Sequence, residues 1–165
     1  LDGDKDYREL VPIAPLDEKV DGRTHKDAVI RELRRLPRKT KGDTGLYDSV
    51  LAAFRAASEN PVPNKLTSIV VFTDGKNEDD DGISRKELLA TLRRKFVPTQ
   101  PVTVSIVGYG RDIEYDELRE IAAATNGVAK VAKDFEEAER IFLSLIARRA
   151  CMECEADQAD ESDES

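Results

Sequence analysis

Residues 68–82 have the sequence SIVVFTDGKNEDDDG, in which a short apolar run passes directly into a polar segment. The four apolar residues at 69–72 are β-branched or aromatic, and such runs are typical of a buried strand in a parallel sheet. Asp74 follows at the carboxyl end of this strand, where open α/β sheets bind their ligands. We expect Gly75 to let the backbone turn sharply there. The pattern therefore indicates Asp74 as a residue that holds a cation or another polar ligand.

Helix and strand patterns alternate along the rest of the chain. The predicted strands are residues 7–13, 69–72, 102–107 and 128–132. The predicted helices follow the capping residues Thr24, Thr44, Ser84, Asp112 and Asp134. Strands separated by helices of this length are typical of βαβ units with right-handed crossovers. The predicted fold class is therefore α/β, with a mainly parallel sheet.

The chain has 165 residues and a formal net charge of −8, and a chain of this length is expected to form one domain. We predict that residues 1–149 form the domain and that residues 150–165 form an acidic, disordered tail. Because this tail carries seven acidic residues and no Lys or Arg, the rest of the chain is close to neutral. A chain without a basic excess is a poor candidate for nucleic-acid binding. No stretch reaches the roughly 18 apolar residues of a membrane span.

Thr44 lies in the segment KGDTGLYD at residues 41–48. A threonine here suits the N-cap of the helix that follows, and that role leaves room for a second one at a ligand site. The acidic run at residues 77–81 offers the oxygen ligands that calcium prefers, but it lacks the spacing and the final glutamate of an EF-hand. A solvated loop is the simpler interpretation of that run.

Other candidate residues carry weaker signals. His25 is the only histidine, and it lies in the first turn of a predicted helix with no serine nucleophile motif near it. No glycine-rich nucleotide loop follows a predicted strand. Cys151 and Cys154 form a C-x-x-C pair, which is half of a zinc site at most. Because the pair follows the last helix, two alternatives stay open: incidental cysteines, or a disulfide or metal pair.

Four blocks of the sequence together resemble the second half of a von Willebrand factor type A (VWA) domain. They are GDTGLYDSVLAAF at 42–54, IVVFTDGKNEDD at 69–80, VTVSIVGYG at 102–110 and DELREIAAATNGVAKVA at 116–132. Their order and spacing are similar to the family over about residues 40–147. The chain most resembles the C-terminal VWA domain of bacterial proteins that join it to a solute-binding-protein-like domain. The resemblance implies a three-layer, Rossmann-like VWA fold.

The resemblance also implies a metal site. In the family, three loops at the carboxyl edge of the sheet form a metal-ion-dependent adhesion site. One loop supplies Asp-x-Ser-x-Ser, the second a threonine and the third an aspartate, and the last two match Thr44 and Asp74. A hard cation such as Mg²⁺, with Mn²⁺ or Ca²⁺ as alternatives, takes about six oxygen ligands. A carboxylate of a partner protein would complete the shell of this ion.

The chain departs from the family pattern in one respect, because it contains no Asp-x-Ser-x-Ser segment. We therefore expect the first central strand of the sheet to be missing and the metal site to be incomplete. The upstream part of its own parent chain, or another chain, is expected to supply the missing loop. The residues themselves indicate no location, while the family resemblance implies an extracellular or cell-surface one.

Three functions stay open on this basis. The first is a protein-interaction domain, not an enzyme, that binds its partner through a divalent metal ion. The second is an interaction domain that binds without metal. The third is a phosphate-ester hydrolase that uses Asp74, although no motif places a second carboxylate, a lysine or a nucleophile beside it.

Overall fold

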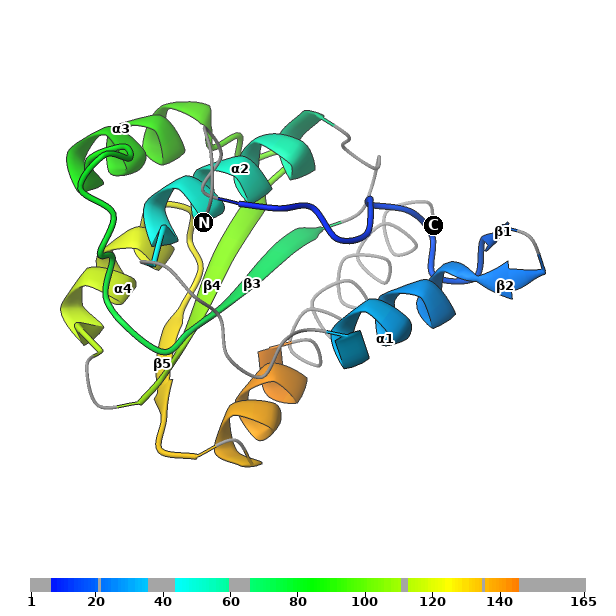
Figure 1. Ribbon diagram of the computed structural model, residues 1–165. Helices are drawn as coiled ribbons and strands as arrows, with labels where there is room; N and C mark the ends of the chain where they lie inside the picture. The colour runs from blue at the N-terminus through cyan, green and yellow to red at the C-terminus, as the bar shows by residue number, and fades with distance from the viewer. Residues whose placement is uncertain are drawn as a thin grey trace, which may run out of the picture. The chain divides into compact units, whose positions relative to one another are not determined.

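The computed structural model describes residues 7–20, 22–35, 44–59, 66–110, 113–134 and 136–145 (Figure 1). The chain divides into two compact units, Leu1–Asp43 and Thr44–Ser165. Residues 150–165, with Cys151 and Cys154, lie outside the described residues. The acidic tail and the bounds of the domain therefore stay predictions.

The N-terminal unit contains a short hairpin followed by a helix. β1 (Lys19–Val20) pairs antiparallel with β2 (Arg23–Thr24), and α1 (His25–Arg35) follows directly. At the start of α1, the Thr24 amide donates to the Asp27 carboxylate at 3.1 Å, and the Asp27 amide donates to the Thr24 hydroxyl at 3.2 Å. These bonds satisfy amides that the helix leaves free, and the predicted capping box is confirmed.

Residues 7–13 are not a strand, so this prediction is wrong. A strand needs a neighbour for its backbone groups, and none of the described strands pairs with this segment. Pro12 also removes one backbone donor from it. Tyr7 and Ile13 are 43% and 68% exposed, so the apolar run does not build a core among the described residues.

The C-terminal unit is built on a parallel sheet. β3 (Thr67–Thr73), β4 (Val102–Tyr109) and β5 (Ala129–Ala132) are arranged in the order β3-β4-β5. Both pairings are parallel, and Ile106 lies opposite Val71 on one side and Ala129 on the other. The prediction of a parallel sheet is confirmed.

Helices alternate with these strands, as predicted. α2 (Leu46–Glu59) precedes the sheet, α3 (Arg85–Lys95) connects β3 to β4, and α4 (Tyr115–Ala123) connects β4 to β5. A further helix covers residues 136–145. The connections are therefore βαβ units, which bring the carboxyl ends of the strands to one edge of the sheet.

Local signals define most of the helix ends. Ser84 and Glu87 form a capping box at the start of α3, and the Glu137 amide donates to the Asp134 carboxylate at 2.7 Å. Asn126 takes a left-handed φ of 56° in the turn after α4. The predicted cap Asp112 lies outside the described residues, and Glu114 occupies the N-cap position of α4 without a side-chain bond.

Helices pack on both faces of the sheet (Figure 1). On one face, apolar side chains of α2, α3 and α4 surround Val104 and Ile106 of β4. On the other face, the helix at 136–145 contributes Ala138 and Ile141, which pack near Val107. The predicted three-layer α/β fold is confirmed. The missing central strand stays a prediction.

Candidate functional site

Asp74 lies directly after β3, at the carboxyl edge of the sheet, and its side chain is exposed. The loop after β4 reaches the same place. Gly110 has a left-handed φ of 122°, and a Cβ at this residue would lie 3.1 Å from the Asp74 carbonyl oxygen. Glycine is required at 110 by both facts. The two loops therefore meet beside Asp74, as the position of this residue at a strand end predicts.

The turn at Asp74 does not depend on Gly75, so that expectation is wrong. The φ of Gly75 lies outside the left-handed region, and a Cβ there would have no neighbour within 4 Å. The turn is stabilised instead by Thr73, whose hydroxyl donates to the Gly75 carbonyl at 2.9 Å and accepts from the Gly75 amide at 3.4 Å. Threonine makes this local bond readily, and the TDG motif alone does not reveal which residue forms the turn.

Thr44 is not the N-cap of α2, contrary to the cap interpretation. α2 begins at Leu46, and the Gly45 carbonyl accepts the amide of Ser49 at 3.1 Å, so Gly45 occupies the N-cap position. Thr44 is instead connected to the loop after β3, because its carbonyl accepts the Glu78 amide at 3.0 Å. The structure therefore joins the segment that carries Thr44 to the loop that carries Asp74.

Two further side chains join these segments, and sequence reasoning did not single them out. The Asn77 side-chain carbonyl accepts the Tyr47 amide at 3.1 Å. The Asp48 carboxylate accepts the Ile83 amide at 3.0 Å. Both bonds connect residues that are 30 or more positions apart, so no local pattern in the sequence could have indicated them.

The acidic loop at residues 77–81 is held by its own hydrogen bonds. One oxygen of the Asp79 carboxylate accepts the amides of Asp81 and Gly82, each at 3.0 Å. The other Asp79 oxygen is buried and has no hydrogen-bond partner among the described residues. In the described part of the chain, no group of three or more acidic, His or Cys side chains is placed to hold a metal ion. The interpretation as a calcium loop has no support from this geometry.

Two buried polar side chains, Tyr47 in the first turn of α2 and Glu117 in the first turn of α4, interact with each other. Tyr47 and Glu117 are 9% and 8% exposed. Burial is the main cause that raises the pKa of Tyr47 from 10.0 to about 12, and the neighbouring Glu117 carboxylate is the second. On the surface next to them, Arg85 of α3 pairs with Glu120 of α4. These contacts connect the helices whose N-termini surround the carboxyl edge.

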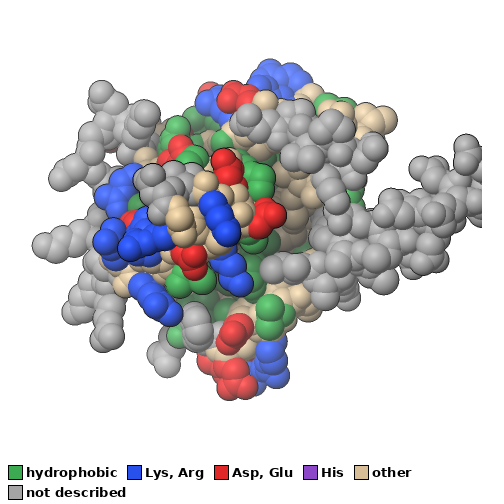
Figure 2. Space-filling model, turned by 90° about the vertical axis from the view of Figure 1, so that its right-hand side faces the viewer, with side chains coloured by type: hydrophobic (Ala, Val, Ile, Leu, Met, Phe, Trp, Pro, Cys, Tyr) green, Lys and Arg blue, Asp and Glu red, His purple; other side chains and the backbone are tan. Residues whose placement is uncertain are grey.

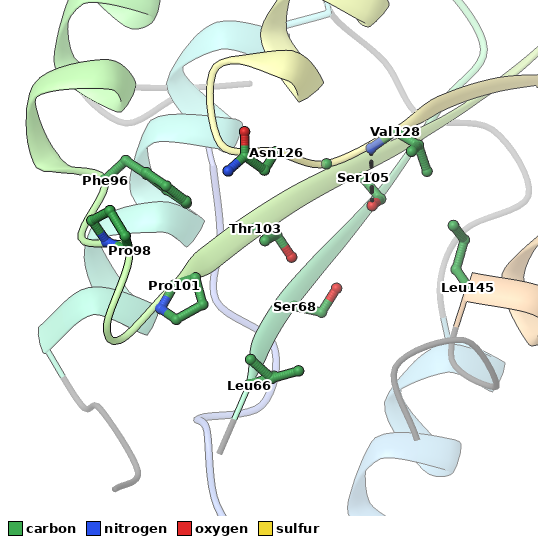
Figure 3. A pocket seen from close by; sticks show the side chains of 11 residues that line it. Leu66, Ser68, Phe96, Pro98, Pro101, Thr103, Ser105, Asn126, Val128 and Leu145 are labelled. Carbon is green, nitrogen blue, oxygen red and sulfur yellow. Dashed lines mark hydrogen bonds between the residues drawn. The ribbon is translucent and has the colours of Figure 1, made fainter. Parts of the chain in front are cut away.

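A cavity of about 350 Å³ lies at the opposite, amino edge of the sheet (Figure 3). Hydroxyl groups of Ser68, Thr103 and Ser105 line it together with apolar residues such as Pro101 and Leu145. The Ser105 hydroxyl accepts the Val128 amide at 3.4 Å, which is the bond drawn in Figure 3. No charged side chain lines this cavity among the described residues. It is therefore separate from the Thr44 and Asp74 segments, and no carboxylate like that of Asp74 lines it among the described residues.

The remaining described candidate, His25, belongs to the N-terminal unit. His25 begins α1 and lines a cavity of about 540 Å³ within the N-terminal unit, beside Arg23 and Arg31. On the described part of the face drawn in Figure 2, acidic and basic side chains are mixed, so this face offers no wide basic surface. No helix in the described ranges is long and apolar enough to cross a membrane.

Comparison with known proteins shows which family the fold resembles. A solved structure described as von Willebrand factor type A from Catenulispora acidiphila superposes with a TM-score of 0.52 at 24% sequence identity. The match covers 67% of this chain but 24% of that one, so this chain spans about a quarter of that protein's length. At this identity the likeness concerns the fold alone. A search of curated proteins found no match. The sequence pattern of the von Willebrand factor type A domain matches residues 11–143. The chain therefore belongs to the von Willebrand factor type A domain family.

Proposed function

We propose that this chain binds a protein partner through a divalent cation held at the carboxyl edge of the sheet, with Thr44 and Asp74 as ligands. The observation that carries the proposal is the bond between the Glu78 amide and the Thr44 carbonyl, which joins the Thr44 segment to the Asp74 loop. VWA domains generally act as protein-interaction domains, and family membership supports this class of function.

The chemistry of the two residues fits a hard cation. Asp74 offers an exposed carboxylate, and the Thr44 hydroxyl makes no hydrogen bond to another described residue. Mg²⁺ prefers oxygen ligands of this kind and keeps several waters. Because two protein ligands neutralise little of its charge, an ion here would attract a carboxylate of the partner. The cation supplies this attraction, and Thr44 and Asp74 would hold it in position.

The Asp-x-Ser-x-Ser loop of the family is not part of this sequence, and we propose that a segment outside it supplies the remaining ligands. The chain by itself would then bind Mg²⁺ weakly. The upstream part of the parent chain is the first candidate for this segment. On the same family likeness we propose an extracellular or cell-surface location.

The test is a titration of the chain with Mg²⁺, in which the chemical shifts of the backbone amides are measured by NMR at each metal concentration. We expect a dissociation constant weaker than about 1 μM, since two protein ligands and water give modest affinity. Asp74→Ala should weaken binding at least about tenfold, because it removes the one charged ligand. The matched control is Asp80→Ala, which removes an exposed aspartate of the same loop and should leave the affinity unchanged.

Three results would change the assignment. A site tighter than about 1 μM would contradict the incomplete shell. Partner binding that survives both a chelator and Asp74→Ala would favour the metal-independent interaction domain. Turnover of p-nitrophenyl phosphate that Asp74→Ala abolishes would favour the hydrolase.

A further inference from the structure

The first turn of α2 lacks a side-chain cap of its own. Gly45 occupies the N-cap position, and glycine has no side chain that could accept a free amide of the first turn. The amide of Tyr47 donates instead to the side-chain carbonyl of Asn77, at 3.1 Å. Tyr47 is the second residue of α2, and this amide is one that an N-cap side chain normally satisfies. Asn77 thus caps the helix from a loop 30 residues further along the chain.

Two further hydrogen bonds join the start of α2 to this loop, and in both of them the loop is the donor. Asp48, in the first turn of α2, accepts the Ile83 amide of the loop at 3.0 Å, and the Thr44 carbonyl accepts the Glu78 amide at 3.0 Å. The Asn77 side chain is itself oriented, because its NH₂ group donates to the Asp79 carbonyl at 3.1 Å. This bond leaves its carbonyl directed at α2. Three bonds therefore hold residues 44–48 against residues 77–83.

This arrangement has a consequence for Thr44. A threonine just before a helix usually uses its hydroxyl to accept a backbone amide of the first turn. Here the cap is supplied by Asn77, and the Thr44 hydroxyl bonds to no other described residue. Asp74 lies three residues before Asn77 in the same loop. Any bond made by Asn77 to α2 therefore also restrains the position of Asp74 relative to Thr44.

We propose that Asn77 is a positioning residue of the Thr44 and Asp74 site. By capping α2 from outside, it leaves the Thr44 hydroxyl available to a cation and holds the Asp74 loop beside it. Asparagine does this without adding charge next to the ion, so the ion keeps its attraction for a partner carboxylate. The proposal rests on the proposed function, since it concerns ligands of the same cation.

The experiment compares three variants of the full chain by Mg²⁺ titration and by thermal unfolding. Asn77→Ala removes the acceptor and should weaken Mg²⁺ binding about tenfold, as loss of a group that orients metal ligands typically does. Asn77→Asp keeps an acceptor for the Tyr47 amide but loses the NH₂ group that donates to the Asp79 carbonyl, so it should recover only part of the affinity. Ser84→Ala removes the cap of α3, where the Ser84 hydroxyl accepts the Glu87 amide at 3.3 Å. This matched control should lower the melting temperature but leave Mg²⁺ affinity unchanged.

A second measurement is independent of metal. Without the Asn77 acceptor, the Tyr47 amide should exchange its hydrogen at least about fivefold faster, whereas the Glu87 amide of α3, which the Ser84 hydroxyl accepts, should not change. The reverse should hold for Ser84→Ala, in which Tyr47 exchange stays slow. Unchanged Tyr47 exchange in Asn77→Ala would overturn the capping role whatever the titration gives.

The outcomes separate this inference from the function on which it rests. If the unmutated chain shows no Mg²⁺-dependent shifts, the proposed function fails and the metal part of the inference fails with it. If the unmutated chain and Asn77→Ala bind Mg²⁺ equally, the function stands and the positioning role is overturned. Equal losses of Mg²⁺ affinity in Asn77→Ala and Ser84→Ala would mean that general destabilisation causes them. That result would also overturn the positioning role.

Discussion

Thr125 and Thr44 stand near opposite edges of the same sheet, and the fold uses them differently. Thr125 is fully buried, accepts the Val104 amide at 2.8 Å and donates to the Ala122 carbonyl at 3.3 Å. The Thr44 hydroxyl makes no such bond with the described residues, and only its backbone carbonyl is engaged. The Thr125 hydroxyl therefore serves the fold itself, whereas the Thr44 hydroxyl serves no bond with the described residues.

Gly127 and Gly75, one at each edge, also differ. A Cβ at Gly127 would lie 1.8 Å from the Val104 carbonyl oxygen, which is backbone and cannot move aside. Gly75, beside Asp74, has open space around it. A Cβ is therefore excluded at Gly127 and tolerated at Gly75, although Gly110 at the carboxyl edge is also tightly placed.

The largest expected effect is on stability and comes from the glycines. Gly127→Ala should lower the free energy of unfolding by about 3 kcal/mol, because the new methyl group overlaps the Val104 carbonyl. Gly75→Ala should change it by less than about 0.5 kcal/mol, since no backbone or steric reason requires glycine there. Urea unfolding of both variants checks the comparison, and equal midpoints would break it.

A smaller effect is expected from the two threonines. Thr125→Val should destabilise the protein by about 1–3 kcal/mol, because it leaves the buried Val104 amide without its acceptor. Thr44→Val should cost less than about 0.5 kcal/mol, because Asn77 rather than Thr44 caps α2. Thermal unfolding of the pair measures the difference. A large loss of stability in Thr44→Val would mean that its hydroxyl serves the fold after all.

The smallest expected effect concerns Tyr47 and high pH. Folding raises the pKa of this phenol from 10.0 to about 12, so the unfolded chain loses the proton first. Stability should therefore fall as the pH rises from about 10 to about 12, and Tyr47 should add no pH dependence below that window.

The control is Tyr47→Phe, which has no phenol proton to lose. Melting temperatures of the two proteins between pH 8 and pH 12 should show a shallower alkaline decline for this variant. Parallel curves would mean that the burial of Tyr47 and its contact with Glu117 do not set its ionisation.

Much of the fold follows from short-range signals in the sequence. The capping boxes at Thr24 and Ser84, and the strand at residues 69–72, depend on neighbours within a few positions and were predicted correctly. The burial predicted for this strand was wrong, because its side chains are only partly buried and Phe72 is 53% exposed. The strand predicted at residues 7–13 was wrong, because a strand also needs a partner that the local pattern does not specify. The cap of α2 was assigned to Thr44 for the same reason, since the acceptor is Asn77, 30 positions from Tyr47. The turn was assigned to Gly75 for a different reason, because the TDG motif does not reveal that the Thr73 hydroxyl stabilises it.

The sequence by itself determined the helices and strands of the C-terminal unit, that its sheet is parallel, and that Asp74 stands at the carboxyl edge. These properties depend on residue periodicity and on caps within a few positions of each other. The tertiary structure alone decided that Asn77 caps α2, that Asp48 binds the Ile83 amide, and that Gly110 passes the Asp74 carbonyl. Each of those contacts joins residues about 30 or more positions apart, and folding, not local pattern, brings such residues together.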